Sequence, residues 1–418
     1  MKIALFGQFG SGNSGNDGSM ESMLNLLRHA RPDCELICIC SDPDLIEARY
    51  NVSSIGITGT TAQRAAAPRW TRFLKAPARK IAALFFLLSS LEGVDILIIP
   101  GTGILDDFQE HPFGWPFVVF RWCIAARLRR ARVAFVSIGA GPVSRRLSRW
   151  FMKLAANSAG YRSYRDAFSR DYVKGLGLDV GSEGLFPDIA FRLPVPAVPP
   201  RTPGARLSVG VGVMQYRGWS KDASDATQIY ETYIAKMTDF VVWLSTKGHN
   251  VLLLTGDVTD RIAMHDIMAR IASREPSLLD LVCAGTGGTL QQLMCNILKT
   301  DIVVASRYHN VVCALKLGRP TISIGYAQKN LDLLTAFGQQ RYSQPIQTFD
   351  LAVLRAQFKQ IVTNVAAVQQ EIETAGLAVQ TSLETQEELL LKWCAEPAAL
   401  RLKRPRRLSG AIGSTNGP

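Results

Sequence analysis

The feature that most constrains the fold is a rhythm of short apolar runs alternating with amphipathic segments. It occurs twice along the chain. In the first half the runs are KIALFGQF, CELICICSD, VDILIIPGTG and ARVAFVSIGAG, and in the second half they include LSVGVGVMQY, NVLLLTG, DIVVASRYH and RPTISIGYA. Nearly continuous apolar strands separated by helices are typical of parallel sheets covered on both faces. The sequence therefore predicts an α/β fold with two Rossmann-like parallel-sheet domains.

A stretch with five prolines, LPVPAVPPRTPGAR over residues 193–206, separates the two halves. Such composition indicates a linker. We expect an N-terminal α/β domain over 1–195, a linker over 196–206, a C-terminal α/β domain with trailing helices over 207–396, and a basic disordered tail over 397–418. Ligands of open parallel sheets bind beyond the carboxyl ends of the strands. The two domains are therefore expected to face each other across a cleft.

Positive charge is concentrated in the first half and the tail of the 418-residue chain. The net charge is +12, of which residues 1–195 carry +7 and residues 397–418 carry +5. This distribution suits an anionic substrate or an anionic surface. Nucleic acid is not expected, because the basic runs lack the interleaved aromatic residues of a stacking platform.

The N-terminus does not predict a signal peptide, because a glycine-rich turn interrupts the first apolar run after Phe6. A basic, acid-free stretch over 64–80 precedes IAALFFLLSSL, which is too short to span a bilayer. This segment is either a solvated loop followed by a buried helix, or a peripheral contact with anionic lipid. The scattered cysteines favour a reduced, cytoplasmic protein. If the basic stretch contacts lipid, the protein would be bound peripherally to the inner face of the plasma membrane.

The first turn after a predicted strand contains GSGNSG, from Gly10 to Gly15, which fits the dinucleotide pattern G-x-G-x-x-G. Asp42 or Asp44 would be the acid that binds the ribose. However, the glycines begin late, polar side chains crowd the turn, and Asp17 at the helix start would repel a pyrophosphate. An NAD-binding enzyme is therefore the less favoured alternative.

Two alternatives remain open for the polar residues of this turn. The turn can cap the following helix and still present side chains to the hydroxyls of a sugar. Capping alone would account for Asp17 or Ser19, but it does not require Asn13 and Gly15 as well. The turn after the next buried strand is similar, with Gly101, Gly103 and the carboxylate of Asp107. That carboxylate either orients a sugar hydroxyl or stabilises a helix N-terminus.

The turn SRYH, at the start of SRYHNVVCALKLGRPTISIGYAQK, has the strongest chemical signal. Ser306, Arg307 and His309 lie at a strand's carboxyl end beside a helix N-terminus. Arginine and helix amides bind carboxylate or phosphate, and histidine is suited to proton transfer. Lys329 follows the next strand and is expected to face the same pocket, and Arg217 in MQYRGW is a further candidate cation.

The order of these motifs resembles the polysaccharide pyruvyl transferase family. The matching segments are GNSGND, PGTGILDDF, SIGAGP, SYRDAFSRDYVKGLG, FPDIAF and the SRYH turn with GRPTISIGYAQK. Two details differ: the family's N-x-G-D is NSGN here, and its triple glycine is Gly101-Thr102-Gly103. Both departures fall in the N-terminal domain, which would bind the acceptor.

The resemblance implies a GT-B-like fold and an enzyme that transfers a pyruvyl group from phosphoenolpyruvate to two hydroxyls of a saccharide, forming a ketal in exopolysaccharide or cell-wall glycan. The acceptor would be a saccharide, in some cases lipid-linked, and neither a cofactor nor a metal is expected. His309 and Arg307 would be catalytic, with Arg307, Lys329 and Arg217 binding the donor in the C-terminal domain. Arg165, Asp166 and Asp188 match the middle motifs.

Two alternatives to this function remain open. One is a nucleotide-sugar glycosyltransferase with the same architecture, although the helix after SRYH lacks the acid that such enzymes use for the ribose. The other is a degenerate family member that only binds its ligand.

Overall fold

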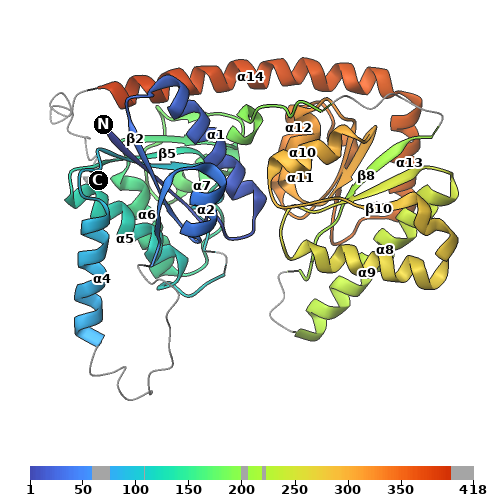
Figure 1. The fold of residues 1–418 in the computed structure, drawn as a ribbon, viewed down its shortest axis with the longest axis horizontal. Helices are drawn as coiled ribbons and strands as arrows, with labels where there is room; N and C mark the ends of the chain where they lie inside the picture. The colour runs from blue at the N-terminus through green and yellow to red at the C-terminus, as the bar shows by residue number, and fades with distance from the viewer. Residues whose placement is uncertain (59–75, 108, 199–205, 219–222, 397–418) are drawn as a thin grey trace, which may run out of the picture.

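The computed structural model describes the chain except for residues 59–75, 108, 199–205, 219–222 and 397–418 (Figure 1). The first domain contains a seven-stranded sheet in the order β3-β2-β1-β4-β5-β6-β7, in which all neighbouring strands are parallel. Its strands are β1 (Lys2–Phe6), β2 (Glu35–Cys40), β3 (Ser53–Gly56), β4 (Ile96–Pro100), β5 (Arg132–Ile138), β6 (Tyr161–Tyr164) and β7 (Gly184–Leu185). Its helices are α1 (Ser14–Ala30), α2 (Pro43–Tyr50), α4 (Ala76–Ser90), α5 (Trp115–Leu128), α6 (Arg146–Ser158), α7 (Ala167–Gly175) and the short 3-10 helix η1 (Ile189–Arg192).

Alternation along β1 explains why both faces of this sheet are covered. Leu5 packs in one cluster with Met20 of α1, whereas Phe6 points to the opposite face and packs against Trp122 of α5. Successive strand side chains point to opposite faces, so an uninterrupted apolar strand requires helices on both sides.

The second domain repeats this plan with a six-stranded parallel sheet in the order β10-β9-β8-β11-β12-β13. Its strands are β8 (Ser208–Gly212), β9 (Asn250–Leu254), β10 (Val282–Ala284), β11 (Ile302–Ala305), β12 (Thr321–Gly325) and β13 (Ser343–Pro345). Its helices are α8 (Ala223–Thr246), α9 (Asp260–Arg274), α10 (Leu290–Leu298), α11 (Tyr308–Lys316), α12 (Gln328–Ala336), α13 (Leu351–Thr363) and α14 (Val365–Ala395), with 3-10 turns at Pro276–Leu281 and Gln340–Tyr342.

Both sheets have the doubly wound strand order, in which the direction of winding reverses between β1 and β4 and between β8 and β11. The crevices at these switch points, beyond the carboxyl ends of the strands, are where such folds bind ligands. The fold class that the sequence predicts, two Rossmann-like parallel-sheet domains, is confirmed.

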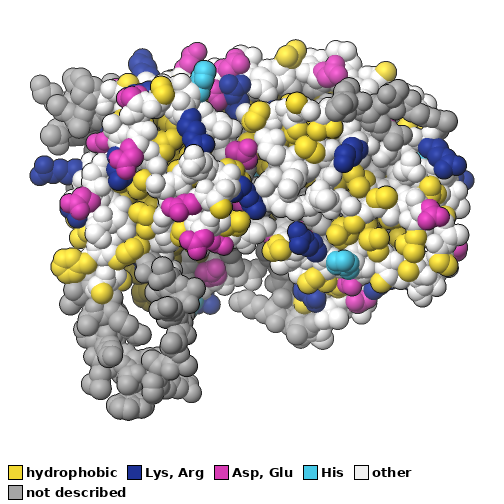
Figure 2. Space-filling model, in the orientation of Figure 1, with side chains coloured by type: hydrophobic (Ala, Val, Ile, Leu, Met, Phe, Trp, Pro, Cys, Tyr) yellow, Lys and Arg dark blue, Asp and Glu magenta, His cyan; other side chains and the backbone are white. Residues whose placement is uncertain are grey.

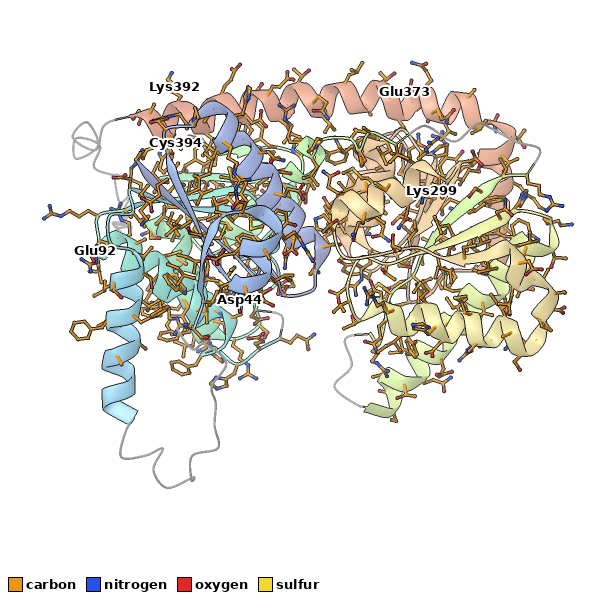
Figure 3. The ribbon with its side chains drawn as sticks, viewed as in Figure 1. Asp44, Glu92, Lys299, Glu373, Lys392 and Cys394 are labelled. Atoms are coloured by element: carbon orange, nitrogen blue, oxygen red, sulfur yellow. The ribbon has the colours of Figure 1, made fainter. Side chains whose placement is uncertain are left out.

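The last helix joins the two domains. α14 starts on the second domain, where Glu373 lies, and runs to the first, where Lys392 and Cys394 lie (Figure 3). Buried Gln386 donates to Ser137 Oγ at 2.7 Å and to Ser163 Oγ at 2.8 Å. α14 therefore contacts both domains, whereas α13 packs against α8 of the second domain.

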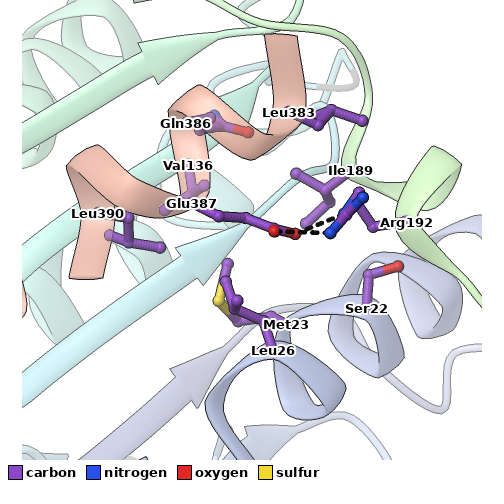
Figure 4. A pocket seen from close by; sticks show the side chains of 10 residues that line it. All are labelled: Ser22, Met23, Leu26, Val136, Ile189, Arg192, Leu383, Gln386, Glu387 and Leu390. Carbon is purple, nitrogen blue, oxygen red and sulfur yellow. Dashed lines mark hydrogen bonds and ion pairs between the residues drawn. The ribbon is translucent and has the colours of Figure 1, made fainter. Parts of the chain in front are cut away.

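An ion pair fixes α14 on the first domain. Arg192 pairs with Glu387 of α14 at 2.7 Å, beside a small cavity of about 10 Å³ that α1, β5 and η1 also line (Figure 4). A second arginine, Arg132 of β5, donates to the carbonyl oxygens of Trp393 and Cys394 at 2.6 Å.

Several sequence predictions fall wholly or partly outside the described residues. These are most of the linker 196–206, most of the basic stretch 64–80 and the tail 397–418. Within the described part of the chain, no helix combines the length and apolarity needed to cross a bilayer.

Candidate functional site

His309 projects from the second domain into the first. It is the second residue of α11, directly after the turn that follows β11. Its Nε2 lies 3.6 Å from Oδ2 of Asp188, which precedes η1 in the first domain. A Cβ built on Gly15, near the start of α1, would lie only 2.0 Å from His309 Nδ1. The imidazole is therefore held between two segments of the first domain.

Asp188 is a buried carboxylate that faces both Arg165 and the imidazole of His309. Its Oδ1 accepts a hydrogen bond from Ala190 N at 2.9 Å, and its Oδ2 lies 3.7 Å from Arg165 Nη1. Burial alone would raise the pKa of Asp188, but the interaction with the nearby His309 imidazole, together with the charge of Arg165, outweighs burial and lowers the pKa to about 2. The carboxylate therefore stays ionised and faces the imidazole.

Acid should destabilise the protein through Asp188. Its folded-state pKa of about 2 lies below its ordinary value of 3.8, so its contribution to stability is present above pH ~4 and is lost as the pH falls toward about 2. The shift corresponds to about 2 kcal/mol. Urea unfolding at a series of pH values should show a smaller stability loss below pH ~4 in Asp188→Asn than in the wild type. Equal losses would contradict this assignment.

Arg307 is held by a carboxylate of its own domain. Its Nε lies 2.9 Å from Oδ2 of Asp260, and its Nη2 lies 2.6 Å from Oδ1. Asp260 is fully buried at the start of α9 and also accepts hydrogen bonds from the backbone N–H groups of Gln215, Gly256 and Asp257. This fork-to-fork geometry fixes the direction of the guanidinium.

The carbonyl of Gly256 extends this network to the first domain. It accepts hydrogen bonds from Ser14 N at 3.2 Å and Ser14 Oγ at 2.7 Å. Beside it, Val258 N donates to Gly12 O at 3.1 Å. The loop that Asp260 organises therefore also forms the contact between the domains next to His309.

Three cations surround Tyr326, which follows β12. Burial would raise the pKa of the Tyr326 hydroxyl, but the positive charges of Lys329, Arg307 and Arg165 outweigh burial, so that its pKa is lowered. Lys329 Nζ lies 5.0 Å from the centroid of the Tyr326 ring and 5.3 Å from that of Tyr308. A potential that favours a buried phenolate favours other anions as well.

Backbone donors add to this positive potential. α11 and α12 both begin beside the three cations, and neither N-cap residue, Arg307 or Ala327, makes a side-chain capping hydrogen bond. Helix N-termini without such caps direct N–H groups and the positive end of the helix dipole outward. Buried polar atoms without a hydrogen-bond partner also gather here: Arg165 Nε, Asp188 Oδ2, His309 Nε2, and the side-chain amides of Asn310 and Asn330.

With this geometry established, comparison with known proteins becomes informative. The family model described as polysaccharide pyruvyl transferase matches residues 13–328. The chain belongs to the polysaccharide pyruvyl transferase family. No curated protein matches it significantly in sequence.

Solved structures share the fold. A glycosyltransferase from Rickettsia africae has a TM-score of 0.59 at 10% identity, covering 94% of this chain and 97% of its own. The Anabaena protein HepE, solved in complex with UDP, has a TM-score of 0.59 at 10% identity, covering 94% and 99%. UDP-GlcNAc 2-epimerase from Neisseria meningitidis, solved bound to UDP-GlcNAc, has a TM-score of 0.57 at 10% identity, covering 94% and 100%. At this identity the likeness concerns the GT-B-like fold alone.

The family motifs meet at this boundary between the domains. Of the residues expected from the sequence, Arg307, His309, Lys329, Arg165 and Gly15 lie together. Gly103 is also close, because a Cβ built on it would lie 3.8 Å from Arg165 Nη2. Gly101 has a φ of +55° and packs against Ser19 of α1. Their roles toward a substrate stay predictions.

Other candidates have structural partners. Asn13 caps α1, because its Oδ1 accepts from Gly15 N at 3.0 Å and from Asn16 N at 3.4 Å. Asp17 accepts from Gly10 N at 2.8 Å and pairs with Arg49 at 3.4 Å. The helix cap is therefore Asn13, and the Asp17 carboxylate holds the preceding glycine loop instead. Asp17 also occupies an amide that a pyrophosphate would need, which counts against the dinucleotide alternative.

Three further candidates also have partners within the protein, and their roles toward a substrate stay predictions. Asp107 is buried and holds a loop, accepting from Gln109 N at 3.0 Å and Ser144 N at 3.1 Å. Ser306 Oγ is buried and shares a hydrogen bond of 2.9 Å with Tyr233 Oη. The Arg217 guanidinium stacks on the Tyr230 ring of α8 at 4.8 Å. Each side chain is therefore engaged by the protein itself.

The sequence did not reveal Asp260 or Tyr326 as members of this group. Asp260 follows Thr259 at a helix start, where an acid is ordinary. The only signal for Tyr326 was its place in GYAQK beside Lys329. Among the described residues, no group of three or more His, Cys, Asp or Glu side chains is placed to hold a metal ion.

Gly15 can be tested by adding a single methyl group. Gly15→Ala should lower turnover by about tenfold to a hundredfold, because the new Cβ forces the His309 ring to move and small misplacements of reacting groups are costly. Gly376→Ala is the matched control, since a Cβ on this glycine of α14 meets nothing within 4 Å. The control should keep full activity. Steady-state kinetics on both variants measures the difference, and equal activities would show that the close approach has no catalytic importance.

Proposed function

We propose that the protein transfers the pyruvyl group of phosphoenolpyruvate to two hydroxyls of a saccharide, producing a cyclic ketal and inorganic phosphate. The saccharide would be part of an exopolysaccharide or cell-wall glycan. The observation that carries the proposal is the cation group around Tyr326, which lies beside His309 at the boundary between the domains.

The charge of the donor suits this group. Phosphoenolpyruvate carries a carboxylate and a phosphate, so its site needs several cations and N–H donors. Lys329, Arg165 and the amides that begin α11 and α12 would provide them. Arg307 would contribute its guanidinium edge, although the negative charge of Asp260 offsets part of the positive potential of that guanidinium.

His309 would supply the proton in the first step. The imidazolium donates it to the methylene carbon of phosphoenolpyruvate, which becomes a methyl group while positive charge develops at the adjacent carbon. One sugar hydroxyl attacks this carbon, and its proton passes to the imidazole that the first step produced. Phosphate then leaves with the C–O bond electrons, and the second hydroxyl closes the ketal while its proton goes to phosphate. Asp188 would stabilise the charged imidazole during this sequence.

The first-domain loops after β1, β4 and β5 would receive the acceptor, because Gly15 after β1 adjoins His309, and Gly103 and Gly139 after β4 and β5 adjoin Arg165. Asp107 and Asp17 are poor bases for the acceptor hydroxyl, since their carboxylates are already bonded within these loops. His309 itself is then the group that both donates and recovers a proton.

Ligand binding tests the donor. Phosphoenolpyruvate at about 100 times its Kd should stabilise the protein by about 2.7 kcal/mol, visible as a raised melting temperature. UDP at the same concentration should have no effect. Stabilisation by UDP and not by phosphoenolpyruvate would support the nucleotide-sugar glycosyltransferase, whose fold the UDP-bound neighbours share.

Catalysis needs a separate measurement. Phosphate release from phosphoenolpyruvate with candidate glycans, followed by mass spectrometry of the glycan, should show a pyruvate ketal. Binding of phosphoenolpyruvate without any release over a wide panel of glycans would favour the degenerate member that only binds.

A further inference from the structure

One part of the first domain has an unusual distribution of charge. Between Glu110 and Asp166, 55 consecutive residues include no Asp or Glu and eleven Lys or Arg. This span contains α5 and α6, which pack side by side against the same face of the sheet. Three arginines of this span, Arg145, Arg146 and Arg149, are exposed around the start of α6.

Aromatic side chains form a continuous group on these two helices. The ring centroid of Phe113 lies 5.7 Å from that of Phe117, Phe117 lies 6.1 Å from Phe120, and Phe120 lies 5.9 Å from Trp150. The fifth ring, Phe151, packs beneath the others. We call this group, together with Leu147 and the flanking Arg145, Arg146 and Arg149, the aromatic–basic patch.

Much of the patch is in contact with solvent. Phe113 is 61% exposed, Trp150 is 52% exposed and Leu147 is 40% exposed. Arg145, Arg146 and Arg149 are all exposed around them. A surface that exposes several large apolar side chains together indicates an interaction site.

Two acids near the patch are engaged by backbone N–H groups. Asp107 holds the Ser144 backbone, and Glu110 accepts from Trp115 N at 2.8 Å. The adjacent helix α4 adds apolar surface, since Leu84 is 50% exposed and Phe85 is 70% exposed. Figure 2 shows apolar side chains on the surface of the first domain.

We propose that the aromatic–basic patch docks the protein on an anionic membrane surface. Exposed tryptophan and phenylalanine insert at the boundary between head groups and acyl chains, and arginines bind anionic head groups. A symmetric contact between two copies would bring the same three arginines of each copy together, which opposes self-association. The complementary charge therefore favours lipid over a second copy.

The place of the patch in the fold gives docking a consequence. Phe113 follows β4, and Arg145 to Leu147 follow β5, so both segments lie at the carboxyl edge of the first sheet. The loops that face His309 lie at this same edge. If the proposed function holds, a membrane-bound protein presents its acceptor loops near the lipid surface, as a lipid-linked saccharide requires.

Vesicle binding by the full chain tests the proposal. Flotation with vesicles of phosphatidylcholine alone, and of phosphatidylcholine mixed with phosphatidylglycerol, should show binding to the anionic vesicles only. Phe113→Ser with Trp150→Ser, and separately Arg146→Gln with Arg149→Gln, should each lower binding by about tenfold. The matched control is Leu377→Ser with Arg274→Gln, because both side chains are exposed but lie elsewhere.

The control pair should bind as the wild type does, since it leaves the patch intact. The basic tail is unchanged in every variant, so it cannot cause a difference between them. Equal binding by the patch variants and the control would overturn the proposal and assign any binding to other basic segments. Absence of wild-type binding would overturn it too. A wild-type dimer that the aromatic variant converts to a monomer in solution would assign the patch to self-association instead.

Membrane docking and the chemistry can fail independently. With a soluble saccharide acceptor and no vesicles, both patch variants should release phosphate from phosphoenolpyruvate at the wild-type rate. Vesicle binding without such release would count against the proposed function and leave the docking surface intact.

Discussion

Replacing His309 by glutamine should lower turnover by about 10²–10⁴-fold, because the variant loses the group that donates a proton to the substrate carbon. Glutamine preserves approximate size and hydrogen bonding but carries no proton that it can transfer. Binding of phosphoenolpyruvate should change little, since Lys329, Arg307 and Arg165 remain. Thermal shift with phosphoenolpyruvate and steady-state kinetics together separate the lost chemistry from lost binding.

The matched control for this substitution is His265→Gln. His265 lies on the exposed surface of α9, outside the group around Tyr326, so its replacement should leave both rates and stability unchanged. If folded His309→Gln retained more than about a tenth of wild-type turnover, the imidazole could not be a general acid of ordinary effect.

The architecture was predictable because its cause is local. Apolar strands such as ILIIP of β4 and IVVA of β11 are buried along their whole length, as a sheet covered on both faces requires. The path of α14 was not predictable in the same way. An amphipathic pattern shows that a helix has a buried face, but not that Gln386 on this face contacts Ser137 and Ser163 of the other domain.

The site shows the same division between local and distant causes. Arg307, His309 and Lys329 could be found because turns after parallel strands converge at one edge of a sheet. The pairing of Arg307 with Asp260 could not, because the two are 47 residues apart and an acid at a helix start needs no distant partner. In the N-terminal turn, the sequence offered Asp17 or Ser19 as the cap, whereas Asn13 caps the helix and Asp17 accepts a hydrogen bond from Gly10 in the preceding loop.

Removing Asp260 should destabilise the protein more than any other single change to the site. Asp260→Ala leaves the guanidinium of Arg307 without its partner, in a position where the Arg307 side chain is only 20% exposed. It also removes the acceptor of the backbone N–H groups of Gln215, Gly256 and Asp257. Loss of one member of a buried ion pair costs about 3–5 kcal/mol.

A surface ion pair provides the control. Asp239 pairs with Arg274 at 3.1 Å, and both side chains are about half exposed, so Asp239→Ala should cost about 0–1 kcal/mol. Asp260→Asn should fall between the two alanine variants, because it keeps one acceptor oxygen but not the charge. Urea unfolding gives all three values, and an Asp260→Ala cost equal to that of Asp239→Ala would contradict the role of this pair.

Stability alone does not show that Asp260 positions Arg307 for a substrate. The loop that Asp260 holds also forms the contact with Ser14, so its loss should loosen Arg307 and the boundary beside His309 together. At a temperature where both variants are folded, Asp260→Asn should raise the KM for phosphoenolpyruvate, while Asp239→Ala leaves it unchanged. A destabilised Asp260→Asn with an unaltered KM would limit this carboxylate to supporting the fold, and the donor would then depend on Lys329, Arg165 and the two helix N-termini.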